Sequence, residues 1–108
     1  MKLLPSLKQK KRYIVFQIIS SYTFSVGDVS TAVNDAFHNF IGELGVARAS
    51  PLFLKERYKD NIMVIKVNHK YVPECIAALT LIKKIKNKGV IVKSIVTSGT
   101  LKKATASL

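Results

Sequence analysis

The side chains able to perform acid–base, redox or metal chemistry are few in this sequence, and their spacing forms no recognised motif. His38 and His69 lie far apart, without carboxylates or thiols at the spacing of metal ligands. Cys75 is the only cysteine, which rules out an internal disulfide or a CxxC pair, and its apolar neighbours indicate a buried thiol. The six acids show no pairing typical of hydrolases, and no Walker or GxGxxG loop occurs. We therefore expect no catalytic residue and no metal or cofactor site in the protein itself.

The chemistry that the sequence does favour is the binding of a polyanion. Lys and Arg number 18 against 6 Asp and Glu, a formal net charge of +12. Residues 1–27 carry five bases and no acid, and residues 75–108 carry seven bases and no acid. A nucleic acid is the natural partner of such a chain. The alternative is a surface that lysines merely make soluble, but such surfaces usually intersperse both signs.

The stretch VTSGTLKKA, residues 96–104, combines several features of a phosphate site. Gly99 permits a positive φ and a close approach of a ligand to the backbone. Thr100 can cap a following helix, whose free N–H groups would face an anion. Lys102 and Lys103 come directly after this turn. The alternative is a glycine turn followed by a basic tail.

The hydrophobic pattern predicts the elements that position these residues. Strands are expected over 12–20, 46–58, 62–67 and 90–97. One helix is expected to begin after Ser25, with a capping-box-like Asp28, and to end at Gly45. A second is expected to begin at Pro73, with Lys83, Lys84 and Lys86 in its last turn, and a short third helix over 100–106.

The order β-α-β-β-α-β is typical of the ferredoxin-like or RRM-like α/β fold, an α+β sandwich with sheet order 4-1-3-2. We expect a single RNA-binding domain over 1–108, with 1–11 as a basic N-terminal arm and 100–108 as a short C-terminal helix or tail. In this topology the start of the first strand abuts the end of the fourth, so the two acid-free ends of the chain form one basic corner. The predicted RNA-binding residues are Lys8, Lys10, Lys11, Arg12, Ser98, Gly99, Thr100, Lys102 and Lys103.

The second face of the predicted sheet is too apolar to meet only water. We expect a protein partner on this open face, and the residues predicted to contact it are Ile62, Val64, Ile91 and Ile95. The alternative is an ordinary half-exposed sheet. The expected third strand, residues 62–67, has no aromatic residue, which argues against base stacking on the sheet in the manner of RNA-recognition motifs.

Three stretches of the sequence carry a resemblance to a known family: LLPSLKQKKRYIVFQII, GELGVARASPLFL and VTSGTLKKA. Taken in this order, they are similar to the archaeal form of ribonuclease P protein component 2, the small subunit shared by archaeal and eukaryal ribonuclease P. The resemblance extends over about residues 3–104. Where the family often has arginine this chain has Lys66, and the family's longer basic C-terminal tail has no counterpart in these residues.

The resemblance implies an RRM-like fold and a non-catalytic subunit of the ribonucleoprotein that removes the 5′ leader of precursor tRNA. RNA would supply the chemistry and would require Mg²⁺. The implied partners are ribonuclease P RNA, whose catalytic domain the protein supports, ribonuclease P protein component 3 and the other ribonuclease P proteins. Self-association as a dimer of heterodimers is also implied, and precursor tRNA is the substrate of the complex.

Two other functions fit parts of the sequence. A small-metabolite-sensing regulatory domain shares the fold pattern but needs neither the net charge of +12 nor its division between the chain ends. A ribosomal protein with this fold would match the charge equally well. No apolar run is long enough for a membrane span, and the N-terminus lacks a secretory h-region, so we expect no membrane partner and a cytoplasmic protein.

Overall fold

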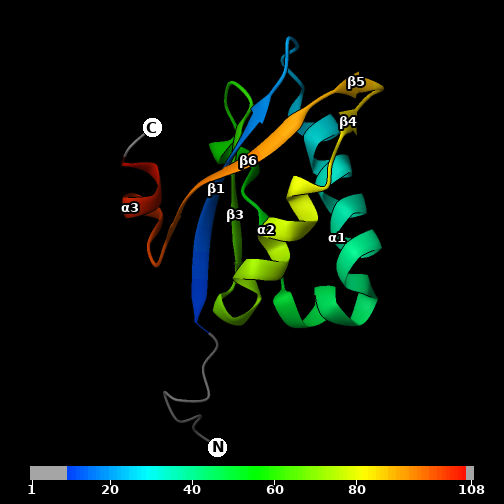
Figure 1. Ribbon diagram of the computed structural model, residues 1–108. Helices are drawn as coiled ribbons and strands as arrows, with labels where there is room; N and C mark the ends of the chain where they lie inside the picture. Colours follow the sequence, from blue (N-terminus) through cyan, green and yellow to red (C-terminus); the bar gives the residue numbers. More distant parts are fainter. Residues whose placement is uncertain (1–9, 107–108) are drawn as a thin grey trace, which may run out of the picture.

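The computed structural model describes residues 10–106 and has a four-stranded antiparallel sheet at its centre (Figure 1). The strands are β1 (Lys11–Ile19), β2 (Leu52–Phe53), β3 (Ile62–Asn68) and β6 (Ile91–Ser98). They lie in the order β2-β3-β1-β6, and both neighbours of β1 run antiparallel to it. The predicted fold class and sheet order are confirmed.

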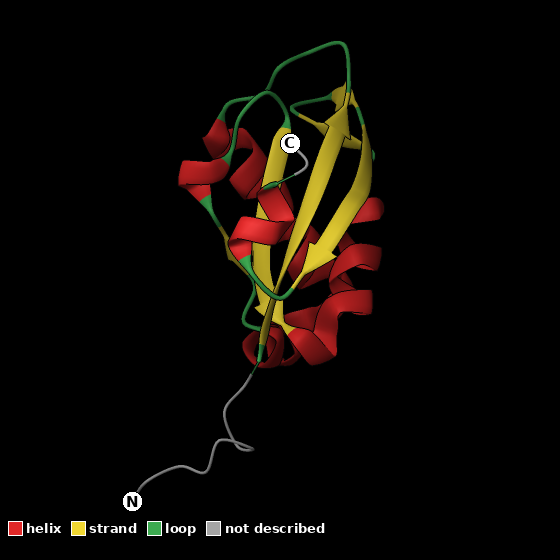
Figure 2. Cartoon of the chain, turned by 90° about the vertical axis from the view of Figure 1, so that its left-hand side faces the viewer, coloured by secondary structure: helices red, strands yellow, loops and turns green. Residues whose placement is uncertain are grey.

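Helices cover both faces of this sheet (Figures 1 and 2). The two longer ones, α1 (Val26–Ala49) and α2 (Val72–Thr80), pack on one face, and the short α3 (Leu101–Thr105) packs on the other. Three further short elements complete the chain: the 3-10 helices η2 (Lys55–Arg57) and η3 (His69–Tyr71), and a hairpin of β4 (Lys84–Ile85) and β5 (Lys88–Gly89).

Alternating side chains of β1 enter two separate hydrophobic clusters. Ile14 and Phe16 are fully buried against α1 and α2, where burial of a large apolar side chain contributes roughly 1.5–3 kcal/mol. Val15 points to the opposite face and is fully buried with Val64 and Ala104 of α3. Because α3 covers this second face, both side-chain sets of β1 are apolar in the sequence.

The first helix is longer than predicted, and its break lies at a different glycine. Ser25 caps α1 as expected, accepting a hydrogen bond from the Asp28 N–H at 3.3 Å. The helix does not end at Gly45: Gly42 has φ 81° and ψ 170°, and helical structure resumes after it as far as Ala49. The predicted strand over 46–58 therefore shrinks to the two residues of β2, followed by η2.

The second helix is shorter than predicted, because the lysine-rich segment after it folds as a hairpin. The helix ends at Thr80, so Lys83, Lys84 and Lys86 do not lie in its last turn. Lys86 and Asn87 both have positive φ, 54° and 64°, as a two-residue turn between antiparallel strands requires. Ile82 and Ile85 of this segment are buried in the core. Because they are three residues apart, the sequence alone indicated a continuing helix.

Candidate nucleic-acid interface

The candidate site forms where the start of β1 meets the end of β6. Tyr13 pairs with Ser98, and Val15 pairs with Val96, after which the register shifts at a bulge. The predicted juxtaposition of the two acid-free ends of the chain is thus confirmed for the described residues. On the other side of β1, Lys10 is fixed through its carbonyl oxygen, which accepts the His69 N–H at 2.9 Å.

Arg12 and Gly99 lie side by side in this region. A Cβ atom built on Gly99 would lie 3.2 Å from Nη1 of Arg12, tighter than most contacts of this kind. The Arg12 side chain also donates from Nη1 to the Lys11 carbonyl at 3.4 Å. Gly99 does not use the positive φ that the sequence suggested, since Gly42 is the one glycine with positive φ among residues 10–106. Its role is to leave room for the guanidinium.

In the turn before α3, side-chain oxygens of the turn itself accept hydrogen bonds from two backbone N–H groups. The Thr100 N–H donates to Oγ of Ser98 at 3.3 Å, and the Lys103 N–H donates to Oγ1 of Thr100 at 3.2 Å. Thr100 is therefore the helix cap that the sequence predicted. The predicted backbone anion site, however, loses these two amide donors, and α3 has only five residues. Side-chain cations, more than the helix end, must supply any affinity for phosphate here.

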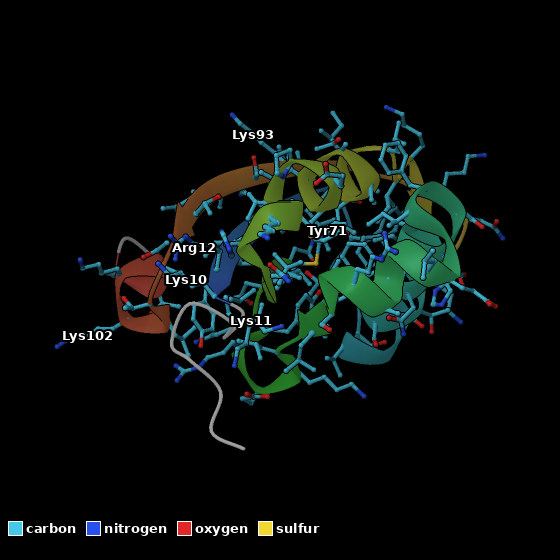
Figure 3. The ribbon with its side chains drawn as sticks, turned by 90° about the horizontal axis from the view of Figure 1, so that it is seen from below. Lys10, Lys11, Arg12, Tyr71, Lys93 and Lys102 are labelled. Atoms are coloured by element: carbon cyan, nitrogen blue, oxygen red, sulfur yellow. The ribbon has the colours of Figure 1, made fainter. Side chains whose placement is uncertain are left out.

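The cations of the candidate site differ in exposure and do not converge on one point: Lys10, Lys102 and Lys103 are exposed, whereas Lys11 and Arg12 are half-buried. Figure 3 views the molecule from the end where β1 begins and shows Lys10 and Arg12 near the turn into α3, while Lys102 points outward. Lys11 and Arg12 are consecutive in β1 and so project to opposite faces of the sheet. Lys103 is exposed on α3, and Lys8 lies outside the described residues. Among residues 10–106 the one ion pair joins Lys86 to Asp28, so no acid pairs with these cations.

The four residues predicted to contact a protein partner differ widely in exposure. Ile91 and Ile95 are 64% and 44% exposed, and Ile19, which pairs with Ile91, is 45% exposed, so exposed apolar side chains flank Lys93 on β6. Val64 is a correction: it is completely buried beneath α3 and offers no surface. Ile62 is half-buried at the rim of the same cluster. Sequence reasoning treated this face as open because α3 was not placed on it.

Two features of the surface were not found from the sequence. A groove of about 540 Å³ lies between α1 and the segment after α2, with Asp28 and Asp35 on one wall and Lys84 and Lys86 on the other. At the end of the molecule opposite the basic corner, the Lys88 ammonium lies 4.2 Å from the centre of the Tyr22 ring. A sequence signal for this second contact is Asn87, a residue type that favours the positive φ of a two-residue hairpin turn.

Two ionisable groups inside the fold have raised pKa values. Burial raises the pKa of the Cys75 thiol to about 12, which keeps it protonated at neutral pH. Burial also raises the pKa of Tyr58, although its hydrogen bonding to Asn61 acts in the opposite direction. Within the described chain no three His, Cys, Asp or Glu residues gather closely enough to hold a metal ion. None of the described helices has the length and apolar character needed to cross a membrane.

Comparisons with known proteins match most of the chain. Residues 12–108 match the family model of the Rpp14/Pop5 family. Over 99 residues the chain is 38% identical to ribonuclease P protein component 2 of Thermococcus kodakarensis, which covers 92% of this chain and 82% of that protein. Over 104 residues it is 31% identical to the protein of the same name from Methanosarcina barkeri, covering 96% and 76% of the two chains.

A solved structure shares the fold. A chain in the cryo-EM structure of yeast ribonuclease MRP matches with a TM-score of 0.70 over 87% of this chain and 77% of that one. The sequences are 16% identical, so this likeness concerns the arrangement of helices and strands alone.

Proposed function

The chain belongs to the Rpp14/Pop5 family, and we propose from this premise that it is a protein subunit of ribonuclease P, the ribonucleoprotein that removes the 5′ leader of precursor tRNA. Its relatives in Thermococcus kodakarensis and Pyrococcus furiosus, 38% and 35% identical, are named as component 2 of that enzyme. The matches extend over 92% of this chain, so the proposal rests on the whole fold and not on one motif.

The role proposed for the protein is to bind and support the catalytic domain of the RNA subunit. The observation that carries it is the set of cations on β1 and α3 where β1 begins and β6 ends, exposed or half-buried, with no acid paired to them among the described residues. Lysine and arginine side chains arranged in this way neutralise backbone phosphates without reading sequence. The chemistry, and the Mg²⁺ that it requires, belong to the RNA in this proposal.

The protein partners that we propose are ribonuclease P protein component 3 and the other ribonuclease P proteins, with self-association as a dimer of heterodimers. The support from this chain is its exposed apolar surface on β6, which includes Ile91 and Ile95. Precursor tRNA is the substrate of the assembled complex.

The proposal is tested by binding ribonuclease P RNA over a range of salt concentrations. If Lys102 and Lys103 contact phosphates, replacing both with alanine makes the plot of log K against log salt shallower by roughly 1–2. Lys59→Ala is the control: Lys59 is also exposed, and its bridge to Ile62, which pairs with Gln17, places it toward the end of β1 opposite the basic corner. A slope unchanged in the double variant would remove α3 from the interface, and the absence of salt-dependent binding by the wild-type chain would overturn the proposed function.

The assignment of the chemistry to RNA has a separate test. Precursor tRNA incubated with the purified chain and Mg²⁺ should remain intact, and the same mixture with the RNA subunit and the other protein subunits should release the 5′ leader. Leader removal by the protein without RNA would contradict the proposed division of labour.

A further inference from the structure

A second cationic site lies at the opposite end of the β1/β6 pair from the basic corner. The hairpin of β4 and β5 precedes β6 directly and, with the residue before it, carries four exposed lysines within six residues. These lysines are Lys83, Lys84, Lys86 and Lys88. From Ile91 to Ser98 the strand spans about 23 Å, so the hairpin lies too far from Arg12 and Gly99 to share one phosphate with them.

The hairpin is fixed to the body of the protein. Ile85 is buried in the main hydrophobic cluster, and the Val90 N–H donates to the Lys83 carbonyl at 2.9 Å, which extends the strand pairing. Nζ of Lys86 lies 3.5 Å from a carboxylate oxygen of Asp28 at the start of α1. Lys86 therefore helps to hold the hairpin on α1, and among the described residues the other three lysines pair with no acid.

Beside the hairpin, the loop after β1 presents an exposed aromatic ring. Tyr22 is 52% exposed, although hydrogen bonds to both its N–H and its carbonyl hold its backbone. The side chain of the buried Asn61 donates to the Tyr22 carbonyl at 2.7 Å and accepts the Phe24 N–H at 3.1 Å. The Tyr58 hydroxyl donates to the Phe24 carbonyl at 2.6 Å. These bonds fix the loop without using the ring or the hydroxyl of Tyr22.

The loop and the hairpin are joined to each other. Oγ of Ser20 donates to the Gly89 carbonyl at 3.2 Å, and the Lys88 ammonium lies 4.2 Å from the centre of the Tyr22 ring. A cation at that distance interacts favourably with the ring face and stays exposed to solvent. The result is a rigid aromatic surface with positive charge beside it.

We propose that Tyr22 and the hairpin lysines form a second RNA site, which takes an unpaired nucleotide with its base on the Tyr22 ring and its phosphates beside Lys83, Lys84 and Lys88. Stacking on a fixed aromatic side chain and neutralisation of neighbouring phosphates are the two recurring elements of binding to unpaired RNA. Because the Lys88 ammonium lies over one face of the ring, the base stacks on the other face, and the ammonium attracts the neighbouring phosphate. This inference rests on the proposed function, because it assumes that the protein binds RNA.

The test uses the full chain and two synthetic RNA stem-loops. One stem is fully paired, and the other has a single bulged 2-aminopurine in the same stem. The wild-type chain should bind the bulged RNA about fivefold or more tightly than the paired one, and 2-aminopurine fluorescence should fall as the base stacks. Tyr22→Leu should bind both RNAs equally and leave the fluorescence unchanged. Tyr22→Phe keeps the ring and should restore both the preference and the quenching.

The lysines are tested separately. Replacing Lys83 and Lys84 with alanine should make the salt dependence of binding to the bulged RNA shallower by up to about 2, whereas Lys55→Ala should leave it unchanged. Because Tyr22, Lys83 and Lys84 are exposed, these variants should retain the wild-type circular dichroism spectrum and thermal midpoint.

The experiments distinguish a failure of the second RNA site from a failure of the proposed function. If the wild-type chain binds RNA with a steep salt dependence but Tyr22→Leu keeps the same preference and quenching, the second site is wrong and the proposed function stands. If Tyr22→Leu instead weakens association with another ribonuclease P protein and leaves RNA binding unchanged, the surface is a protein contact and the inference is overturned. If the wild-type chain binds neither RNA, both proposals are overturned.

Discussion

The roles of single residues in the basic corner depend on their contacts more than on their residue types. Gly99 was expected to provide a positive φ, and the structure shows that it instead leaves space beside the Arg12 guanidinium. Thr100 was expected to cap α3 and does so, but its hydroxyl thereby occupies the Lys103 amide that an anion would have used. The residue types of such a turn are readable from a sequence, whereas their hydrogen-bond partners depend on how the chain folds back.

The Gly99 contact predicts a specific effect of a small substitution. Gly99→Ala places a Cβ 3.2 Å from Nη1 of Arg12, and because that atom is the far end of a flexible side chain, the guanidinium moves while the fold stays intact. We expect RNA affinity to fall by no more than Arg12→Ala makes it fall, and the double variant to be no weaker than Arg12→Ala alone. Binding titrations on the three variants, with circular dichroism as the folding control, measure this. Additive losses in the double variant would mean that Gly99 acts through its own backbone.

Burial of Cys75 predicts how stability depends on alkaline pH. Its pKa rises from 9.0 to about 12 on folding, so the unfolded chain loses the thiol proton first. The stability provided by the neutral thiol is complete below pH 9 and declines between pH 9 and pH 12. Relative to Cys75→Ala, the wild-type chain should lose about 2 kcal/mol of unfolding free energy between pH 8 and pH 10.5. Urea unfolding of both chains at the two pH values tests this, and an equal change in both would show that Cys75 ionises in the folded state.

At the scale of elements, the helical conformation of α1 is interrupted at Gly42, three residues before the end that the sequence predicted. Gly42 and Gly45 are both inside the helical pattern, and sequence reasoning chose Gly45 as the end. The structure places the break at Gly42, in a backbone region open almost solely to glycine, and Gly45 continues the helix with its backbone close to Ile41. The segment after the break packs Val46 and Ala49 on the core, which holds the kink.

Two glycines of the same helix therefore respond differently to alanine. Gly42→Ala should lower the free energy of unfolding by about 1–3 kcal/mol, because its φ of 81° strains any side chain although nothing lies within 4 Å of the new Cβ. Gly27 also has open space around it but an ordinary φ, so Gly27→Ala should be neutral or stabilising by up to about 1 kcal/mol. Chemical denaturation measures both. Equal effects of the two substitutions would show that α1 is not broken at Gly42.

The strands and their order could be predicted from the sequence, and the surroundings of the site only in part. Strongly β-branched runs fixed β1, β3 and β6 to within about two residues, and the β-α-β-β-α-β order then gave the sheet. The hairpin after α2 was missed because Ile82 and Ile85 repeat at a helical spacing while filling the core from an irregular segment. The burial of Val64 was missed because the short helix α3 packs on the face of the sheet opposite α1 and α2, and the sequence did not indicate this packing.

At the scale of the whole molecule, the cations lie at both ends of the β1/β6 pair, and exposed apolar side chains lie between them on β6 and beside α1. Cations gather at both ends of the β1/β6 pair, whereas α1 carries Asp28, Asp35 and Glu43 with Arg48 as its one base. The groove beside α1 has exposed apolar rims at Phe40 and Leu81. A polyanion would approach the ends of the β1/β6 pair, and protein partners would find apolar side chains between those ends on β6 or at the groove beside α1.

The apolar surface of β6 predicts where a protein partner binds. Ile91 and Ile95 are 64% and 44% exposed, so glutamate at either position should leave the fold intact. If a partner buries them, the lost apolar contact and the buried charge should weaken association by at least about tenfold. Sedimentation of each variant with component 3, and alone for self-association, measures the effect. Leu52→Glu is the matched control, because Leu52 is 53% exposed on β2 at the other edge of the sheet and should not change association.

Val64→Glu should unfold the chain, since that side chain is completely buried. Folded Ile91→Glu and Ile95→Glu variants that associate as tightly as the wild type would exclude this strand from the protein interface.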